Sequence, residues 1–203
     1  MSPLFRNNTR PIRCVDFLYS FVVFAFAHSL PASAAEPVTP VMVEVSKHGE
    51  RISIDADFQA AVTPQQAWEV LTDFDHMRDF ISSLQSSQIV ARDGMRWQVA
   101  QKGAARRGPL NFSFDSIRQI DLVPFNRITS RQLSGSMKQF EAVTRLSPQG
   151  TGTRIQYHAD SVPGTFIPPI VGIAFIETES RRQFEEMRSE MIRRSLQSIS
   201  SHQ

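Results

Sequence analysis

The sequence has little of what several functional classes require. Cysteine occurs only once, as Cys14, and the 203 residues include just two tryptophans and two tyrosines. A single cysteine excludes an internal disulfide framework and a thiolate metal site. The histidines form neither a His-x-His nor a His-Glu-x-x-His spacing. We therefore expect no metal site and no cofactor.

An excess of positive charge is also lacking. The chain has 22 Lys and Arg residues against 20 Asp and Glu, and residues 1–35 hold three of the former and one of the latter, which leaves 19 of each in the remainder. Binding to nucleic acid requires clustered positive charge, so we expect no nucleic-acid partner. Hydrophobic residues make up 41% and charged residues 21% of the chain, which is typical of a soluble globular domain.

Residues 1–35 have the pattern of a secretory signal peptide. Three arginines precede an apolar core over residues 17–27, and small residues follow at 32–35. This core is too short to cross a bilayer as a helix, which takes about 20 residues. We expect cleavage after Ala34 or Ala35 and a periplasmic location, with an uncleaved N-terminal anchor as the alternative. The mature chain would then contain no cysteine.

After a short lead-in over residues 36–41, residues 42–199 predict one α+β domain. Apolar and polar residues alternate in several short runs, which is the pattern of half-buried strands. We expect about seven antiparallel strands, connected as a meander after the first. Thr63 and Gln66 have the spacing of a capping box, and Pro64 suits the first helical turn, so a short helix should begin there.

Two further helical segments are predicted, a short one over residues 77–84 and a long one over residues 170–199. Apolar side chains three or four residues apart give the long helix one apolar stripe. Such a stripe must be buried, and the antiparallel sheet is the available partner. We expect the sheet to curve around this helix and to leave a cavity between them.

Four stretches, residues 63–75, 77–81, 150–157 and 163–169, resemble those of the START-like, helix-grip proteins of the SRPBCC superfamily. Within it they are similar to the polyketide cyclase/dehydrase and coenzyme-Q-binding START-domain group. The resemblance covers about residues 42–199 and implies a curved antiparallel sheet around a long C-terminal helix. It also implies an internal cavity for a lipid, quinone, hormone or polyketide. The residues that carry it cap, pack and turn, so they indicate a fold rather than a reaction.

The candidate ligand-binding residues are aromatic and apolar side chains expected on the inner face of the sheet or along the stripe of the last helix. They are Phe112, Phe114, Tyr157, Phe166, Ile170, Ile173, Phe184, Met187 and Met191. Neighbours on a strand point to opposite faces, and we expect Tyr157 rather than His158 to point inward. The Tyr157 hydroxyl then either binds a ligand carbonyl or satisfies a backbone group.

Other polar groups have simpler interpretations. Asp73 and Asp75 are expected to end a helix and shape a turn rather than to form an acid–base pair, and Asp115 is expected to be solvated. The apolar segment 166–176 either fills the core or borders the cavity mouth. The basic turn with Lys102 is interpreted as solvated, with contact to an anionic membrane surface as the alternative.

These observations favour binding, and with it transport or sequestration, of one hydrophobic small molecule such as a lipid, an isoprenoid quinone or a polyketide-like compound. A transient contact with a membrane would fit this function. The alternative is a cyclase or dehydratase that uses acid and base groups in the same cavity. No such pair is identifiable, so no catalytic residue is assigned. A third hypothesis, a cytoplasmic protein-interaction module, is incompatible with export.

Overall fold

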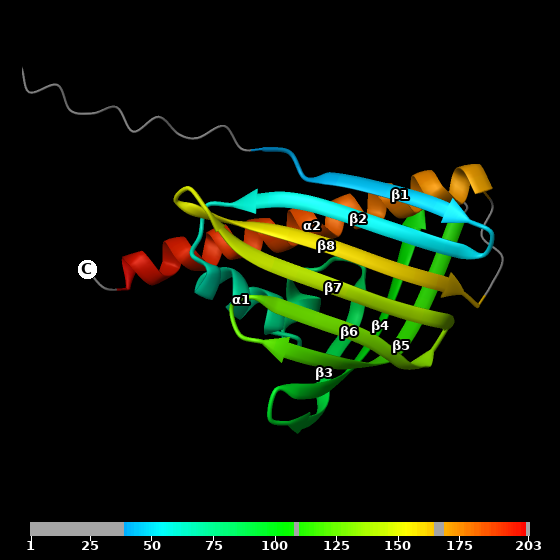
Figure 1. The fold of residues 1–203 in the computed structure, drawn as a ribbon, viewed down its shortest axis with the longest axis horizontal. Coiled ribbons are helices and arrows are strands. Elements are labelled where there is room, and N and C mark those ends of the chain that lie inside the picture. Colours follow the sequence, from blue (N-terminus) through cyan, green and yellow to red (C-terminus); the bar gives the residue numbers. More distant parts are fainter. Residues whose placement is uncertain (1–38, 108–109, 165–168, 202–203) are drawn as a thin grey trace, which may run out of the picture. The chain divides into compact units, whose positions relative to one another are not determined.

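The computed structural model describes residues 39–107, 110–164 and 169–201, and one antiparallel sheet dominates it (Figure 1). The strands are β1 (Met42–His48), β2 (Arg51–Ala60), β3 (Leu84–Asp93), β4 (Arg96–Arg107), β5 (Leu110–Val123), β6 (Arg127–Gly135), β7 (Met137–Gln149) and β8 (Gly152–Pro163). Their order in the sheet is β1-β2-β8-β7-β6-β5-β4-β3. Strands β3 to β8 therefore form the predicted meander, and β2 pairs with the last strand of that meander.

The sheet has eight strands, one more than predicted. The additional strand arises because residues 42–60, which were expected to contribute one strand, form a hairpin. Gly49 has a φ of +62° in its two-residue turn, a conformation that glycine adopts without steric cost. β1 pairs with β2 along its whole length, from Met42 opposite Asp57 to His48 opposite Arg51.

The first helix, α1 (Pro64–Thr72), begins at the predicted capping box. The backbone N–H of Gln66 donates to Thr63 Oγ1 at 3.3 Å, and the N–H of Thr63 donates to Gln66 Oε1 at 3.0 Å. The next helical piece, η1 (Met77–Asp79), is a single 3₁₀ turn and is shorter than predicted. It ends early because Leu84 already pairs with Gly103 as the first residue of β3.

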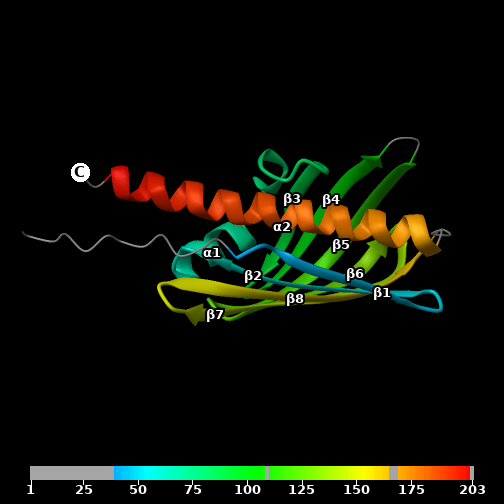
Figure 2. The same cartoon turned by 90° about the horizontal axis from the view of Figure 1, so that it is seen from above.

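The last helix, α2 (Pro169–Ser200), lies across the concave face of the sheet (Figure 2). Its buried side chains Phe184 and Met191 belong to the same hydrophobic core as Phe58 of β2, and the Phe58 and Phe184 ring centroids are 5.7 Å apart. Ion pairs four residues apart lie along the helix, among them Glu177 with Arg181 at 2.7 Å and Glu190 with Arg194 at 2.6 Å. The curved sheet and long helix confirm the predicted helix-grip architecture.

Residues 37–203 form one compact unit. The predicted signal peptide, residues 1–35, lies outside the described residues. No helix within the described part of the chain is both long and apolar enough to cross a membrane.

Candidate functional site

A cavity of about 410 Å³ lies between the inner face of the sheet and α2. This volume falls within the range of about 300–1,000 Å³ that is usual for small-molecule sites. Strands β2 to β8, the segment around η1 and the N-terminal half of α2 all contribute lining residues. The position is the one that the sequence predicted for a ligand cavity.

Alternation along the strands decides which side chains reach this cavity. On β5, Phe114, Ser116 and Arg118 line it, and Ile120, next on the same face, is buried in the core. Gly103 of β4 lies opposite Phe114, and a Cβ atom at that position would stand 2.4 Å from Phe114 Cζ. The absence of a side chain on Gly103 therefore makes room for the Phe114 ring.

Most of the lining is apolar. Ile52 and Ile54 of β2 contribute from the sheet, and Phe175, Phe184 and Met187 contribute from α2. The Phe184 ring also lies against the Tyr157 ring, with centroids 5.0 Å apart. A ligand in this space would be enclosed mainly by hydrocarbon, with a minority of polar groups contributed by the sheet, the rim and α2.

Of the nine candidate residues, Phe114, Tyr157, Phe184 and Met187 line the cavity. Tyr157 faces inward, whereas His158 lies on the outer face beside Asp55, with His158 Nδ1 2.8 Å from Asp55 Oδ1. The side chains of Phe112, Phe166 and Ile170 are outside the described residues. The described part of the apolar segment 166–176 borders the cavity through Gly172, Phe175 and Ile176.

Two candidates do not line the cavity, although they share the apolar stripe of α2. Met191 is fully buried in the core, and Ile173 is half-buried but absent from the cavity wall. Met191 is enclosed because α1 packs against this end of α2, where Asp73 at the end of α1 binds Arg194 at 2.8 Å. Met191 therefore belongs to the predicted apolar stripe, but it lies in the part of the stripe that is packed in the core and not in the part that lines the cavity.

Sequence analysis missed a polar row that crosses four neighbouring strands on the inner face. We call it the Arg118 row: Ser87 of β3, Gln101 of β4, Arg118 of β5 and Ser130 of β6. Arg118 Nη2 donates to Gln101 Oε1, and Arg118 Nη1 donates to Ser130 Oγ at 3.4 Å. Gln101 Nε2 in turn donates to Ser87 Oγ at 2.9 Å. Arg118 and Gln101 both line the cavity.

The Arg118 guanidinium carries a charge in a largely apolar space. Burial lowers the pKa of Arg118, but arginine remains protonated in proteins. Its Nε is buried and has no hydrogen-bond partner among the described residues. The guanidinium carbon lies 5.6 Å from the Phe140 ring centroid. Burial also raises the pKa of Tyr157 to about 12, although nearby Arg118 opposes this shift, so its hydroxyl is neutral at physiological pH.

A sequence signal for Arg118 existed. Apolar and polar residues begin to alternate at Leu110, and β5 continues well past Phe114 to Val123. If the alternation is extended past Phe114, Arg118 shares its face with Ile120 and Leu122. An arginine on the apolar face of a strand indicates a functional residue, because arginine is rarely buried unless its charge is paired.

The carboxylates near the cavity form no acid–base pair with one another. Glu179 and Asp115 line it, but Glu179 forms an ion pair with Arg182 on the same helix, and Asp115 is exposed on the rim. Among the described residues, no group of three or more His, Cys, Asp or Glu side chains is placed to hold a metal ion.

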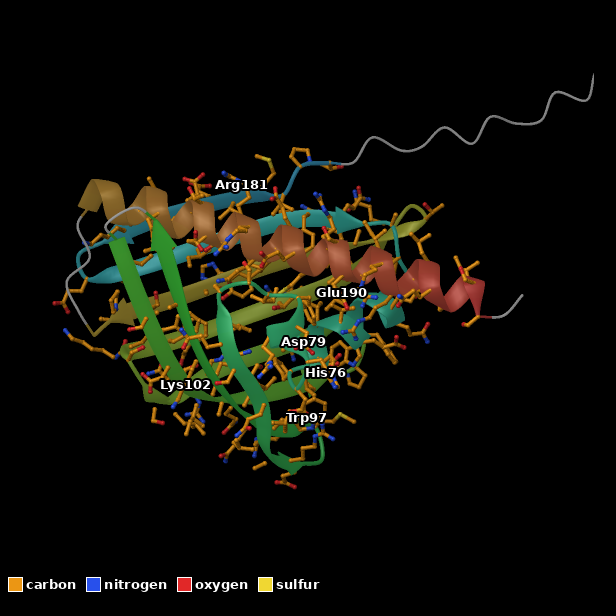
Figure 3. The ribbon with its side chains drawn as sticks, turned by 180° about the vertical axis from the view of Figure 1, so that it is seen from behind. His76, Asp79, Trp97, Lys102, Arg181 and Glu190 are labelled. Carbon is orange, nitrogen blue, oxygen red and sulfur yellow. The ribbon has the colours of Figure 1, made fainter. Side chains whose placement is uncertain are left out.

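Asp73 and Asp75 lie outside the cavity lining and have the structural roles predicted for them. Asp73 ends α1 and contacts His76 Nδ1 at 2.7 Å, and Asp75 Oδ1 accepts the Ile89 N–H at 2.7 Å. In Figure 3, His76 lies close to the segment of α2 that carries Glu190, at the packed end of the helix.

The sequence of residues 60–188 matches the family model described as polyketide cyclase / dehydrase and lipid transport. A search of curated proteins finds no match. Among solved structures, a STAR-related lipid transfer protein from Xanthomonas axonopodis is 14% identical, with a TM-score of 0.61 over 77% of this chain and 96% of that one. The Zhui aromatase/cyclase from Streptomyces sp. R1128 is 17% identical, with a TM-score of 0.60 over 71% and 96%.

A START superfamily protein from Mycobacterium smegmatis is 13% identical, with a TM-score of 0.60 over 70% of this chain and 97% of that one. At these identities the likeness to solved structures establishes the fold alone. The family model, in contrast, spans more than half of the sequence and includes α1, the sheet from the end of β2 onward and the first part of α2. The chain therefore belongs to the polyketide cyclase / dehydrase and lipid transport family and has the START-like, helix-grip fold.

Proposed function

We propose that the protein binds one hydrophobic small molecule in the cavity between the sheet and α2. The observation that carries this proposal is an internal space of about 410 Å³ with a mainly apolar wall. Apolar burial contributes roughly 25 cal/mol per Å², from which the costs of ordering and immobilising the ligand are subtracted. A lipid, an isoprenoid quinone and a polyketide-like compound are the ligand classes we propose.

Binding is favoured over cyclisation or dehydration by the chemistry of the described cavity wall. The titratable residues that line it are Arg118, Tyr157, Asp115 and Glu179, and of these Asp115 directs its side chain to the outer face of the sheet. A general base works best with a pKa near the working pH, whereas burial raises the pKa of Tyr157 to about 12. Arg118 is also unsuited to the role of a base, because its guanidinium stays protonated. These two groups are suited to donating hydrogen bonds rather than to exchanging protons with a substrate.

We further propose that the protein acts after export to the periplasm, as the N-terminal pattern of arginines, apolar core and small residues indicates. A hydrophobic ligand in that compartment would come from or go to a membrane. Transport or sequestration of such a ligand, with transient membrane contact, is the role that fits a single-molecule cavity.

The proposal is testable by filling the cavity. Ser180 of α2 lines it, and Ser189 lies further along the same helix and is exposed. We expect Ser180→Trp to abolish the uptake of a bound lipid or quinone by delipidated protein, because the indole would occupy the ligand volume. Ser189→Trp should leave uptake unchanged. Uptake is measured by native mass spectrometry against a panel of phospholipids, quinones and aromatic polyketides. Equal uptake by the two variants would contradict binding in this cavity.

A further inference from the structure

The Arg118 row contains a buried charge without a counter-charge. Among the described residues, the hydrogen-bond partners of the Arg118 guanidinium are Gln101 and Ser130, both neutral. Taking an ion out of water is energetically unfavourable unless an opposite charge compensates for it. A methionine or leucine would bridge the same strands at lower cost, so strand packing alone does not account for an arginine here.

The carboxylates that border the cavity do not neutralise Arg118. Glu179 forms an ion pair with Arg182, and its side chain is only 13% exposed. Asp115 lies three residues before Arg118 on the same strand, so its side chain points to the opposite face, and it is exposed. Tyr157 also lines the cavity, but its hydroxyl is neutral at physiological pH and supplies no counter-charge.

The guanidinium is also held in place. Its two Nη atoms donate to side chains of the strands on either side of β5, to Gln101 of β4 and to Ser130 of β6. Gln101 is itself fixed by Ser87 Oγ at 2.9 Å and contacts Met77 Sδ at 3.5 Å. The Arg118 guanidinium is therefore already oriented before a ligand arrives, and this lowers the entropic cost of binding.

We propose that the ligand is an amphiphile with one carboxylate, which binds at Arg118 while its apolar body lies along α2. This inference rests on the proposed function. A guanidinium is suited to a carboxylate, because its planar N–H groups match the two oxygens. A single negative charge matches the one cation of the described cavity wall, whereas a phosphate dianion would leave excess charge buried.

The surroundings of Arg118 supply the rest of the site. The neutral Tyr157 hydroxyl belongs to the same wall and offers a further donor for a ligand oxygen. The Tyr157 ring lies against Phe184, and Phe175 and Met187 continue the apolar surface along the helix. The acid group would thus be held against the sheet, with the hydrocarbon body between the sheet and α2.

The test compares ligands that differ only in the head group. Delipidated protein is titrated with hexadecanoic acid and hexadecanol, and with dodecanoic acid and dodecanol, by isothermal calorimetry at pH 8, where the acids are ionised. Hydrogen bonds to a charged partner contribute enough to predict about tenfold or greater preference for each acid over its alcohol. Equal affinity for acid and alcohol would overturn the carboxylate assignment and leave hydrophobic binding intact. If none of the four binds, the carboxylate assignment is overturned as well, and the uptake panel of phospholipids, quinones and polyketides decides the proposed function separately.

Variants locate the preference. Arg118→Met preserves length and apolar packing, and we expect it to remove the preference for the acids while alcohol binding remains. Arg118→Lys retains the positive charge and should keep part of the preference, which makes the test independent of how well the methionine variant folds. Arg131→Met is the matched control, because Arg131 is exposed on the outer face of β6 and contacts Gln119 there. An unchanged preference in Arg118→Met would overturn the proposal.

Discussion

The two halves of α2 lie along the same sheet but in different surroundings. Toward its C-terminal end, Met191 is fully buried and α1 packs against the helix. From Gly172 to Met187 the helix instead borders the cavity. One continuous apolar stripe therefore serves two purposes. Its packed half stabilises the fold, and its open half leaves an apolar surface available to a ligand.

Two methionines one helical turn apart provide the sharpest test of this difference. Met191→Ala should lower the free energy of unfolding by about 3 kcal/mol, because it opens a new cavity in a close-packed region. Met187→Ala should cost about 1 kcal/mol or less, because Met187 already borders an empty space. Urea denaturation of delipidated protein measures both values. Equal losses would show that the two halves are packed alike.

Gly103 tests the wall of the open half. A Cβ there would lie 2.4 Å from Phe114 Cζ and 2.5 Å from the Ser83 carbonyl oxygen, which accepts the Ala104 N–H. Gly103→Ala should therefore destabilise the protein by about 2 kcal/mol, since overpacked positions force neighbours to move. Thermal unfolding measures the loss. A variant as stable as the parent would mean that Phe114 and the η1–β3 connection can move away from the new Cβ atom at little energetic cost.

Glu190 tests the electrostatics of the packed half. Hydrogen bonding to Arg193, partly opposed by burial and assisted by Arg194, holds the pKa of Glu190 below its ordinary value of 4.5. A carboxylate whose pKa is lowered by folding adds stability above its unfolded pKa, and this stability is lost as pH falls through the folded pKa. Glu190→Gln should therefore cost about 1 kcal/mol at pH 7, a figure that allows for the exposure of the arginines. The cost should shrink below about pH 4.

The matched control for Glu190 is Glu177, which pairs with Arg181 at 2.7 Å in the open half. Both partners are more than a third exposed, so Glu177→Gln should change the unfolding free energy by at most about 0.5 kcal/mol. Urea denaturation at neutral and acidic pH measures both variants. If Glu190→Gln showed no dependence on pH, the ion pairs around it would not stabilise the packed half.

Local patterns in the sequence predicted much of this architecture. The capping box at Thr63, the meander and the stripe of α2 all depend on residues close together in the chain, and each is present. The hairpin at Gly49 was missed because two alternating runs separated by a short turn were treated as one strand. The helical segment at η1 is shorter than predicted because the chain already pairs with β4 from Leu84 onward, as strand β3.

The site was harder to predict because it depends on distant strands. The Arg118 row joins side chains from four strands, and its members meet only through the register of the sheet. The separation of Met187 from Met191 depends on where α1 packs, which the periodicity of α2 does not encode. Tyr157 was placed correctly because alternation on a single strand was sufficient.

The most direct measurement is native mass spectrometry of the protein, purified gently from the cells that produce it, followed by organic extraction of whatever it carries. Hydrophobic binding predicts one small apolar molecule per chain, and the Arg118 site predicts that this molecule contains a carboxylate. A neutral ligand would contradict only the carboxylate. An empty protein that also takes up no lipid, quinone, polyketide or fatty acid would contradict ligand binding in the cavity.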